Sequence, residues 1–195
     1  MPSVFAASPF DPYKDDWTSE GRPRLGEQFL NVGYFLHGLR VRMRFGEISR
    51  APLQLLRLNI LGEIVKCDWL ARSPDPWDRD LPSGIRERHA SLQTLRDAID
   101  VRALLFNTMP HIATADFRVY REAPNHSREM VMTGCVQRND NTSRDVHSLA
   151  MRAKVLGFCF YLEGDTLRKI LTEEELRTRD QRDHTAVTQE RRFPV

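Results

Sequence analysis

Two stretches of this 195-residue chain show the same succession of patterns. In each, a strand, a short connection, a second strand and a polar loop lead into an amphipathic helix. The first stretch covers about residues 53–106 and the second about 115–157. Alternating strands bury one face in a sheet, and helices with one apolar stripe pack against that face. The repeat therefore predicts an α+β protein in which residues 25–171 form a single domain.

The first unit is expected to begin with a hairpin. One face of its first strand holds Leu56, Leu58 and Ile60, and one face of its second holds Val65, Cys67 and Trp69. Its helix should begin near Ser83 and end by Pro110, because proline cannot continue a helix. The expected apolar stripe is Ile85, Leu92, Leu95, Ile99 and Phe106, and the expected solvent side is Arg86, Arg88, Arg96 and Asp97.

The second unit repeats this order and is followed by a C-terminal hairpin. Its strands fall around residues 117–119 and 130–136, and its helix is expected to start at a cap, Thr142 or Ser143, and to stop at Gly157. Residues 158–162 and 166–171 then alternate on either side of a turn at 163–165. We expect this last hairpin to complete an antiparallel sheet with both helices packed on one face.

The second face of that sheet also needs a cover. Met130-Val131-Met132 and Leu55-Leu56 are apolar on both sides of their strands, which indicates a second apolar face. Residues 25–40, another subunit or a partner could cover it. Residues 25–44 carry a helical pattern that turns into strict alternation near Gly38, so we expect a helix followed by a strand.

The two ends of the chain differ from this domain in composition. Residues 1–24 hold four prolines and a polar run, which predicts an extended or disordered arm. Residues 172–195 are highly charged, which predicts a mobile tail that is helical in part. Neither a secretory signal nor a membrane-spanning stretch is expected.

Composition favours a bacterial, cytoplasmic protein. Arginine outnumbers lysine 25 to 4, which is typical of a GC-rich genome and weakens arginine content as evidence for nucleic-acid binding. The three cysteines are far apart and odd in number, so they predict neither a disulfide framework nor a zinc knuckle. A reducing cytoplasm is the simplest compartment for such a chain.

The segment from Pro74 to Pro82 is the most individual part of the sequence, with three carboxylates and a tryptophan between prolines. It does not fit a calcium loop, because Pro82 and Ser83 stand where that motif needs oxygen ligands and glycine. It can be a rigid connection that packs its tryptophan on the core, or a partner-binding loop. The candidate partner-binding residues are Asp75, Trp77, Asp78 and Asp80.

Motifs for metal, cofactor or nucleophilic chemistry are not recognisable in this sequence. A glycine-rich phosphate loop and a GxSxG elbow are both missing, so we expect no cofactor and no catalytic residue by these routes. If the two units were symmetric, Cys67 and Cys135 could converge with His89 and His147 in a zinc site. Cysteines on strands are more often small buried hydrophobic residues, so we expect no metal.

Four arginines suggest a different binding surface. Arg40, Arg42 and Arg44 alternate and, with Arg50, would form a basic ridge on a strand beside Tyr34, Phe35 and Phe45. Such a ridge can follow a phosphate backbone while an aromatic ring stacks on a base. It can equally be the solvated side of an edge strand.

These patterns leave three functional hypotheses. The first is a non-catalytic protein that associates with itself or with a protein partner, because a second apolar sheet face would need a cover. The second is a nucleic-acid-binding module that uses the arginine ridge. The third is an enzyme whose site is assembled only in space, from residues such as His89, His147 and Asp78.

Overall fold

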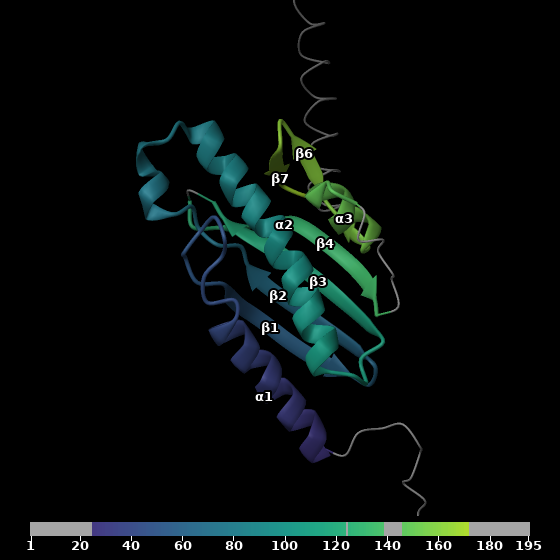
Figure 1. Cartoon of the computed structure of the whole chain (residues 1–195). Coiled ribbons are helices and arrows are strands. Elements are labelled where there is room, and N and C mark those ends of the chain that lie inside the picture. Colours follow the sequence, from purple (N-terminus) through teal and green to yellow (C-terminus); the bar gives the residue numbers. More distant parts are fainter. Residues whose placement is uncertain (1–24, 124, 139–145, 172–195) are drawn as a thin grey trace, which may run out of the picture.

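A computed structural model describes residues 25–123, 125–138 and 146–171, and in them three helices lie against a five-stranded sheet (Figure 1). The helices are α1 (Leu25–Val41), α2 (Ser83–Thr108) and α3 (Leu149–Val155). The strands of the sheet are β1 (Gln54–Leu61), β2 (Ile64–Leu70), β3 (Thr114–Glu122), β4 (Arg128–Gln137) and β5 (Phe158–Cys159). A 3-10 helix, η1 (Pro76–Asp80), precedes α2, and β6 (Tyr161–Glu163) pairs with β7 (Thr166–Arg168). The predicted α+β class is confirmed; the predicted arm and tail lie outside the described residues.

The sheet is mixed, with strand order β1-β2-β3-β4-β5. The two predicted hairpins, β1–β2 and β3–β4, are antiparallel. β2 and β3 are parallel, and their register runs from Ile64 opposite Thr114 to Leu70 opposite Tyr120. The reason is that α2 carries the chain back along the sheet, so β3 starts at the same end as β2. The prediction of an antiparallel sheet is therefore wrong for the pair β2–β3.

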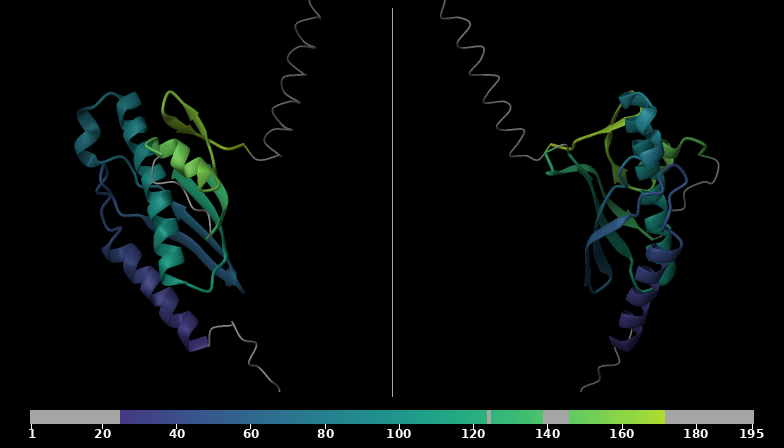
Figure 2. Two further views of the ribbon diagram at one scale, coloured as in Figure 1. Left: turned by 45° about the vertical axis from the view of Figure 1, so that its right-hand side comes forward. Right: turned by 90° about the vertical axis from the view of Figure 1, so that its left-hand side faces the viewer.

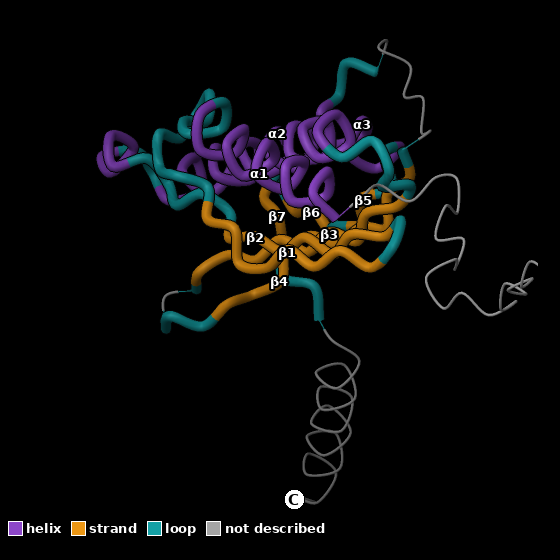
Figure 3. The backbone as a smooth tube through the Cα atoms, turned by 90° about the horizontal axis from the view of Figure 1, so that it is seen from below, coloured by secondary structure: helices purple, strands orange, loops and turns teal. Residues whose placement is uncertain are grey.

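The core lies between the sheet and the helices, all of which cover the same face (Figure 3). The helix-facing residues of the two central strands are fully buried: Val65, Cys67, Trp69, Ala115, Phe117 and Val119. Phe117 makes a T-shaped contact with Trp69 and stacks on Phe158, with 5.5 Å between ring centroids in each case. The prediction that the helices pack on one face is confirmed.

The second face of the sheet is polar at its centre. Arg57, Asp68 and Arg118 stand next to one another across β1, β2 and β3. The neighbouring row continues with Lys66 and Asp116. Opposite charges on adjacent strands stabilise one another and need no cover. The expected second apolar face is therefore interrupted by charged residues at its centre. α1 does not cover this face, since α1 lies beside α2 on the other side (Figure 2).

The strand expected after Gly38 does not form, because α1 continues to Val41 and ends in a turn. Phe35 and Leu39 are buried along the side of α1 that faces the core, and Met43, in the turn after α1, is buried as well, so the helical spacing of buried residues persists past Gly38. Gly38 lets the helix approach α2 closely: a Cβ there would lie 2.6 Å from a methyl group of Leu104. Burial of this apolar stripe favours the helix over the strand that the alternation of apolar residues with arginine predicted.

α2 begins at Ser83 as predicted and ends at Thr108, before Pro110. α3 is shorter than predicted, since Val146 to Ser148 are not helical and Ser148 is the cap, its hydroxyl accepting from the Met151 N–H. Thr142 and Ser143 lie outside the described residues. Gly157 ends α3 with a positive φ of 91°, as expected of a terminating glycine.

The predicted C-terminal hairpin is confirmed as β6 and β7, but it forms a separate two-stranded sheet. Only β5 joins the main sheet, opposite Thr133 and Gly134 of β4. In the described part of the chain, none of the helices combines the length and the apolarity needed to cross a membrane.

Candidate functional site

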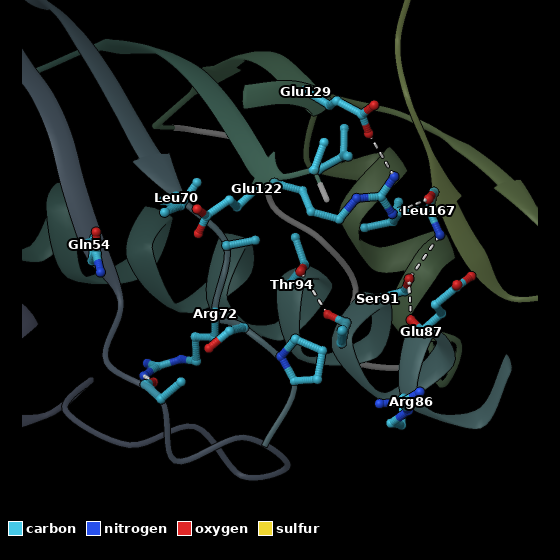
Figure 4. A pocket seen from close by; sticks show the side chains of 18 of the residues that line it. Gln54, Leu70, Arg72, Arg86, Glu87, Ser91, Thr94, Glu122, Glu129 and Leu167 are labelled. Atoms are coloured by element: carbon cyan, nitrogen blue, oxygen red, sulfur yellow. Dashed lines mark hydrogen bonds and ion pairs between the residues drawn. The ribbon is translucent and has the colours of Figure 1, made fainter. Parts of the chain in front are cut away.

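A cavity of about 670 Å³ lies beyond the carboxyl ends of β2 and β3, the parallel pair. Its walls come from the segment before β1, the residues after β2, the N-terminal half of α2, the turn between β3 and β4, and β7 (Figure 4). Cavities of this size hold small organic molecules, and the carboxyl ends of parallel strands are common places for them. The sequence patterns gave no sign of this cavity, because its walls are distant from one another along the chain.

The cavity walls carry both apolar and charged side chains. The apolar ones include Ala51, Pro52, Leu70, Ala71, Val131 and Leu167, and the charged ones are Arg72, Arg86, Arg121, Arg168, Glu87, Glu122 and Glu129. Three arginines have acidic partners, which are Asp97 for Arg72, Glu129 for Arg121 and Glu163 for Arg168. Among the described residues Arg86 has no such partner, and its Nε is buried without a hydrogen bond.

Arg72 connects the cavity wall to the interior. Its side chain is 1% exposed, and its Nε donates to Asp97 of α2 at 2.9 Å. Its two terminal nitrogens donate to the carbonyl oxygens of Met43 and Ala51 at 2.6 Å and of Arg44 at 3.2 Å. This single guanidinium therefore fixes the segment after α1 and the segment before β1 to α2.

Asp97 is the second member of this buried network. Its other oxygen accepts from Gln93, whose own oxygen accepts from the backbone N–H of Ile48 at 2.7 Å. Burial raises the pKa of Asp97, against the opposing effects of Arg72 and Gln93. The prediction that Asp97 faces solvent is wrong, because its partner Arg72 lies 25 residues earlier, in an irregular segment that periodicity does not reveal.

The predicted partner-binding residues divide into two kinds. Asp75 is buried and structural: it is the N-cap of η1, accepts from Trp77 N–H at 3.0 Å and also accepts from Arg50 N–H at 2.8 Å. Trp77 is 82% exposed, so the alternative that it packs on the core is wrong. Asp78 lies 3.2 Å from His89 Nδ1, and Asp80 is exposed. Partner binding by this loop stays a prediction.

The role of Asp75 gives a pH-dependent expectation. Hydrogen bonds from Trp77 N–H and then Arg50 N–H hold the pKa of Asp75 below its ordinary value of 3.8. Because the folded-state pKa is depressed, the stabilisation is present above pH 3.8 and is lost as the pH falls through the folded pKa. Asp75→Ala should thus lower the urea midpoint at neutral pH, and the difference from wild type should shrink on acidification. Asp80→Ala is the matched control, and a difference independent of pH would contradict this role for Asp75.

The four arginines proposed for nucleic acid do not share one strand. Arg40 lies in the last turn of α1, Arg42 and Arg44 in the turn after it, and Arg50 just before β1. All four are exposed. The guanidinium of Arg44 lies 5.1 Å from the ring centroid of Phe45, a cation–π contact. Nucleic-acid binding stays a prediction, but the straight ridge on which it depended does not form.

The histidines and cysteines considered for a zinc site do not converge. Cys67 is buried on the helix-facing side of β2, whereas Cys135 lies on the opposite face, next to Asp116 of β3. A hydrogen bond with Asp116 raises the pKa of the Cys135 thiol, which disfavours its thiolate. Within residues 25–123, 125–138 and 146–171, no group of three or more His, Cys, Asp or Glu could hold a metal ion.

A second candidate surface is the outer side of α1, which we call the α1 face. It consists of exposed residues at helical spacing: Gly26, Phe29, Leu30, Gly33, Tyr34, His37 and Val41. The exposed fractions of Phe29, Leu30, Tyr34 and Val41 are 73%, 61%, 62% and 60%. The sequence contained one sign of this surface, since α1 has only two charged side chains, Glu27 and Arg40. A helix that is apolar all round is normally buried on all sides.

Comparison with models of protein families, with curated proteins and with solved structures found no match for this chain.

Proposed function

We propose that this protein is a non-catalytic assembly protein that associates with a second copy of itself through the α1 face. The observation that supports this proposal is the row of large apolar side chains that α1 leaves in water. Single exposed apolar residues are ordinary on protein surfaces, but a contiguous row along a helix is typical of an interaction site. The interface proposed here lies on α1, and not on the second sheet face or the segment from Pro74 to Pro82.

The pattern of sizes along the α1 face suits a copy of itself. If two α1 helices pack antiparallel around a two-fold axis between Gly33 and Tyr34, Gly33 of each copy lies opposite Tyr34 of the other. In the same arrangement Gly26 lies opposite Val41, and Leu30 lies opposite His37. Tyr34 and Val41 then each face a glycine of the other copy. The space beside these glycines is open, because a Cβ added to Gly26 or Gly33 would have no neighbour within 4 Å. Such self-complementarity is what a two-fold interface requires.

The charges on α1 also favour a like surface over a charged partner. Glu27 and Arg40 are the only charged residues of the helix and lie near its two ends. The centre of the α1 face therefore has no charge with which to select an acidic or basic protein. A 17-residue helix is only about 25 Å long, so the interface is small and we expect dissociation in the micromolar range.

Sedimentation equilibrium of the full chain over a range of concentrations tests this proposal. The wild-type protein should show a monomer–dimer equilibrium at micromolar concentration. Leu30→Glu with Tyr34→Glu places two charges in the interface and should weaken dimerisation by about a hundredfold or more. Because both positions are solvent-exposed in the monomer, the circular dichroism spectrum should not change.

A matched control is available on α3. Met151 and Val155 are 53% and 50% exposed and lie one helical turn apart, as Leu30 and Tyr34 do. Met151→Glu with Val155→Glu should leave the dimer intact. A wild-type protein that is monomeric at high micromolar concentration, or a dimer equally sensitive to both pairs, would contradict the proposal.

We also propose a reducing compartment such as the cytoplasm. Cys135 and Cys159 are exposed and free, and exposed thiols are typical of proteins that do not encounter oxidising conditions. The enzyme hypothesis stays a prediction: Asp78 and His89 are in contact, but no described hydrogen bond or ion pair joins His147 to either.

A further inference from the structure

We infer that the cavity beyond β2 and β3 binds a small organic carboxylate with an apolar body, whose acid group pairs with Arg86. This inference does not depend on association through α1, because α1 contributes no residue to the cavity. The observation behind it is the buried Nε of Arg86, which has no hydrogen-bond partner among the described residues.

Arg86 stands apart from the other arginines of the cavity. Its Nε is buried and, among the described residues, makes no hydrogen bond, and the side chain forms no ion pair with any of them. A buried donor on a charged group is costly to leave unpaired. A carboxylate satisfies a guanidinium well, because two oxygens match two of its N–H groups in one plane. A bound acid would therefore supply the missing acceptor.

The other charges on the walls limit how much negative charge the ligand can carry. Glu87, Glu122 and Glu129 line the same cavity, and Arg121 pairs with Glu129 at 3.1 Å. Figure 4 shows Glu129 and Glu122 across the cavity from Arg86. These carboxylates would repel a group with two or more negative charges. A single carboxylate next to Arg86 keeps its charge away from Glu122 and Glu129.

The remaining wall favours an apolar body behind the acid group. Leu70 and Val131 come from the strands, Leu167 from β7, and Ala90 from the helix side. Burial of CH₂ groups against such a surface stabilises a complex, and formate and phosphate have no such groups to bury. The mixed lining is therefore suited to an amphipathic acid.

The walls are held in place before any ligand binds. The hydroxyl of Ser91 accepts from the backbone N–H of Leu167 at 2.9 Å, and Arg121 donates to the carbonyl oxygen of Leu167 at 3.2 Å (Figure 4). These bonds fix β7 over α2 and the end of β3. On the other side Arg72 fixes the segment after β2 to α2 through Asp97. Such a preformed site loses little entropy on binding.

An NMR titration of the full ¹⁵N-labelled chain tests the inference with defined probes. Hexanoate and benzoate should shift the amide signals of cavity residues such as Thr94 and Leu167. The uncharged hexanamide and benzamide should bind about tenfold or more weakly, the range expected for a hydrogen bond to a charged group. Arg86→Gln should reduce the affinity for the acids to that of the amides.

Two further variants separate the site from general effects of charge and folding. Arg79→Gln removes an exposed arginine of η1 outside the cavity and should leave binding unchanged. Ala90→Leu fills the cavity and should abolish binding of both acids. The inference is overturned if acids and amides bind alike, if Arg86→Gln binds as wild type does, if shifts lie outside the cavity, or if inorganic phosphate binds more tightly than hexanoate.

Discussion

Arg72→Met is expected to lower the free energy of unfolding by about 3–5 kcal/mol, as is usual when one partner of a buried ion pair is removed. The substitution leaves the Asp97 carboxyl without its cationic partner in a position where its side chain is 3% exposed, so it must be either an unpaired buried charge or protonated. It also removes the donors that satisfy the carbonyl oxygens of Met43 and Ala51. Urea unfolding followed by tryptophan fluorescence measures the loss, and the midpoint should fall without a large change in slope.

Two comparisons show whether the loss of stability comes from leaving Asp97 buried without its partner. Arg72→Met combined with Asp97→Leu removes both charges and should be less destabilised than Arg72→Met alone. Arg88→Met breaks the exposed ion pair with Asp165 and should cost less than about 0.5 kcal/mol. If Arg72→Met were as mild as Arg88→Met, the buried network would not hold the segment after α1.

Phe117→Ala is the second substitution for which we expect a large effect, about 3–5 kcal/mol of destabilisation. The ring is fully buried at the centre of the sheet, between Trp69 and Phe158. Its removal would leave a cavity that close neighbours on three strands cannot refill. Thermal or urea unfolding measures the loss. Trp77→Ala removes a larger ring that is 82% exposed and should change stability by less than about 0.5 kcal/mol, so comparable losses would contradict the packing described for Phe117.

The sequence predicted those parts of the fold that local patterns determine. Both hairpins follow from alternation, and the limits of α2 follow from Ser83 and Pro110. The parallel pairing of β2 with β3 has no local signature, because it results from the path of α2 over the sheet. The same is true of β5 and β6, which follow one another in the chain but join different sheets.

The candidate sites were harder to predict for two physical reasons. The sequence pattern places both Arg86 and Asp97 on the solvent side of the helix. In the described part of the chain the Nε of Arg86 is buried without a hydrogen bond, whereas Asp97 is buried in an ion pair with Arg72. Their surroundings come from segments far away in the sequence. The α1 face could not be predicted because apolar residues such as Phe29 and Phe35 lie on several sides of a nearly uncharged helix. The sequence pattern therefore does not distinguish the buried side of α1 from the exposed side.

The parallel pair at the centre of the sheet also has a consequence for the order of folding. Each hairpin closes a short loop, since Leu61 pairs with Ile64 across two residues. Ile64 pairs with Thr114, 50 positions further along the chain, so joining the hairpins costs more loop-closure entropy. The loop between β2 and β3 becomes shorter in effect only after α2 has formed and packed on the sheet. We therefore expect the two hairpins to form early and the pairing of β2 with β3 to form late.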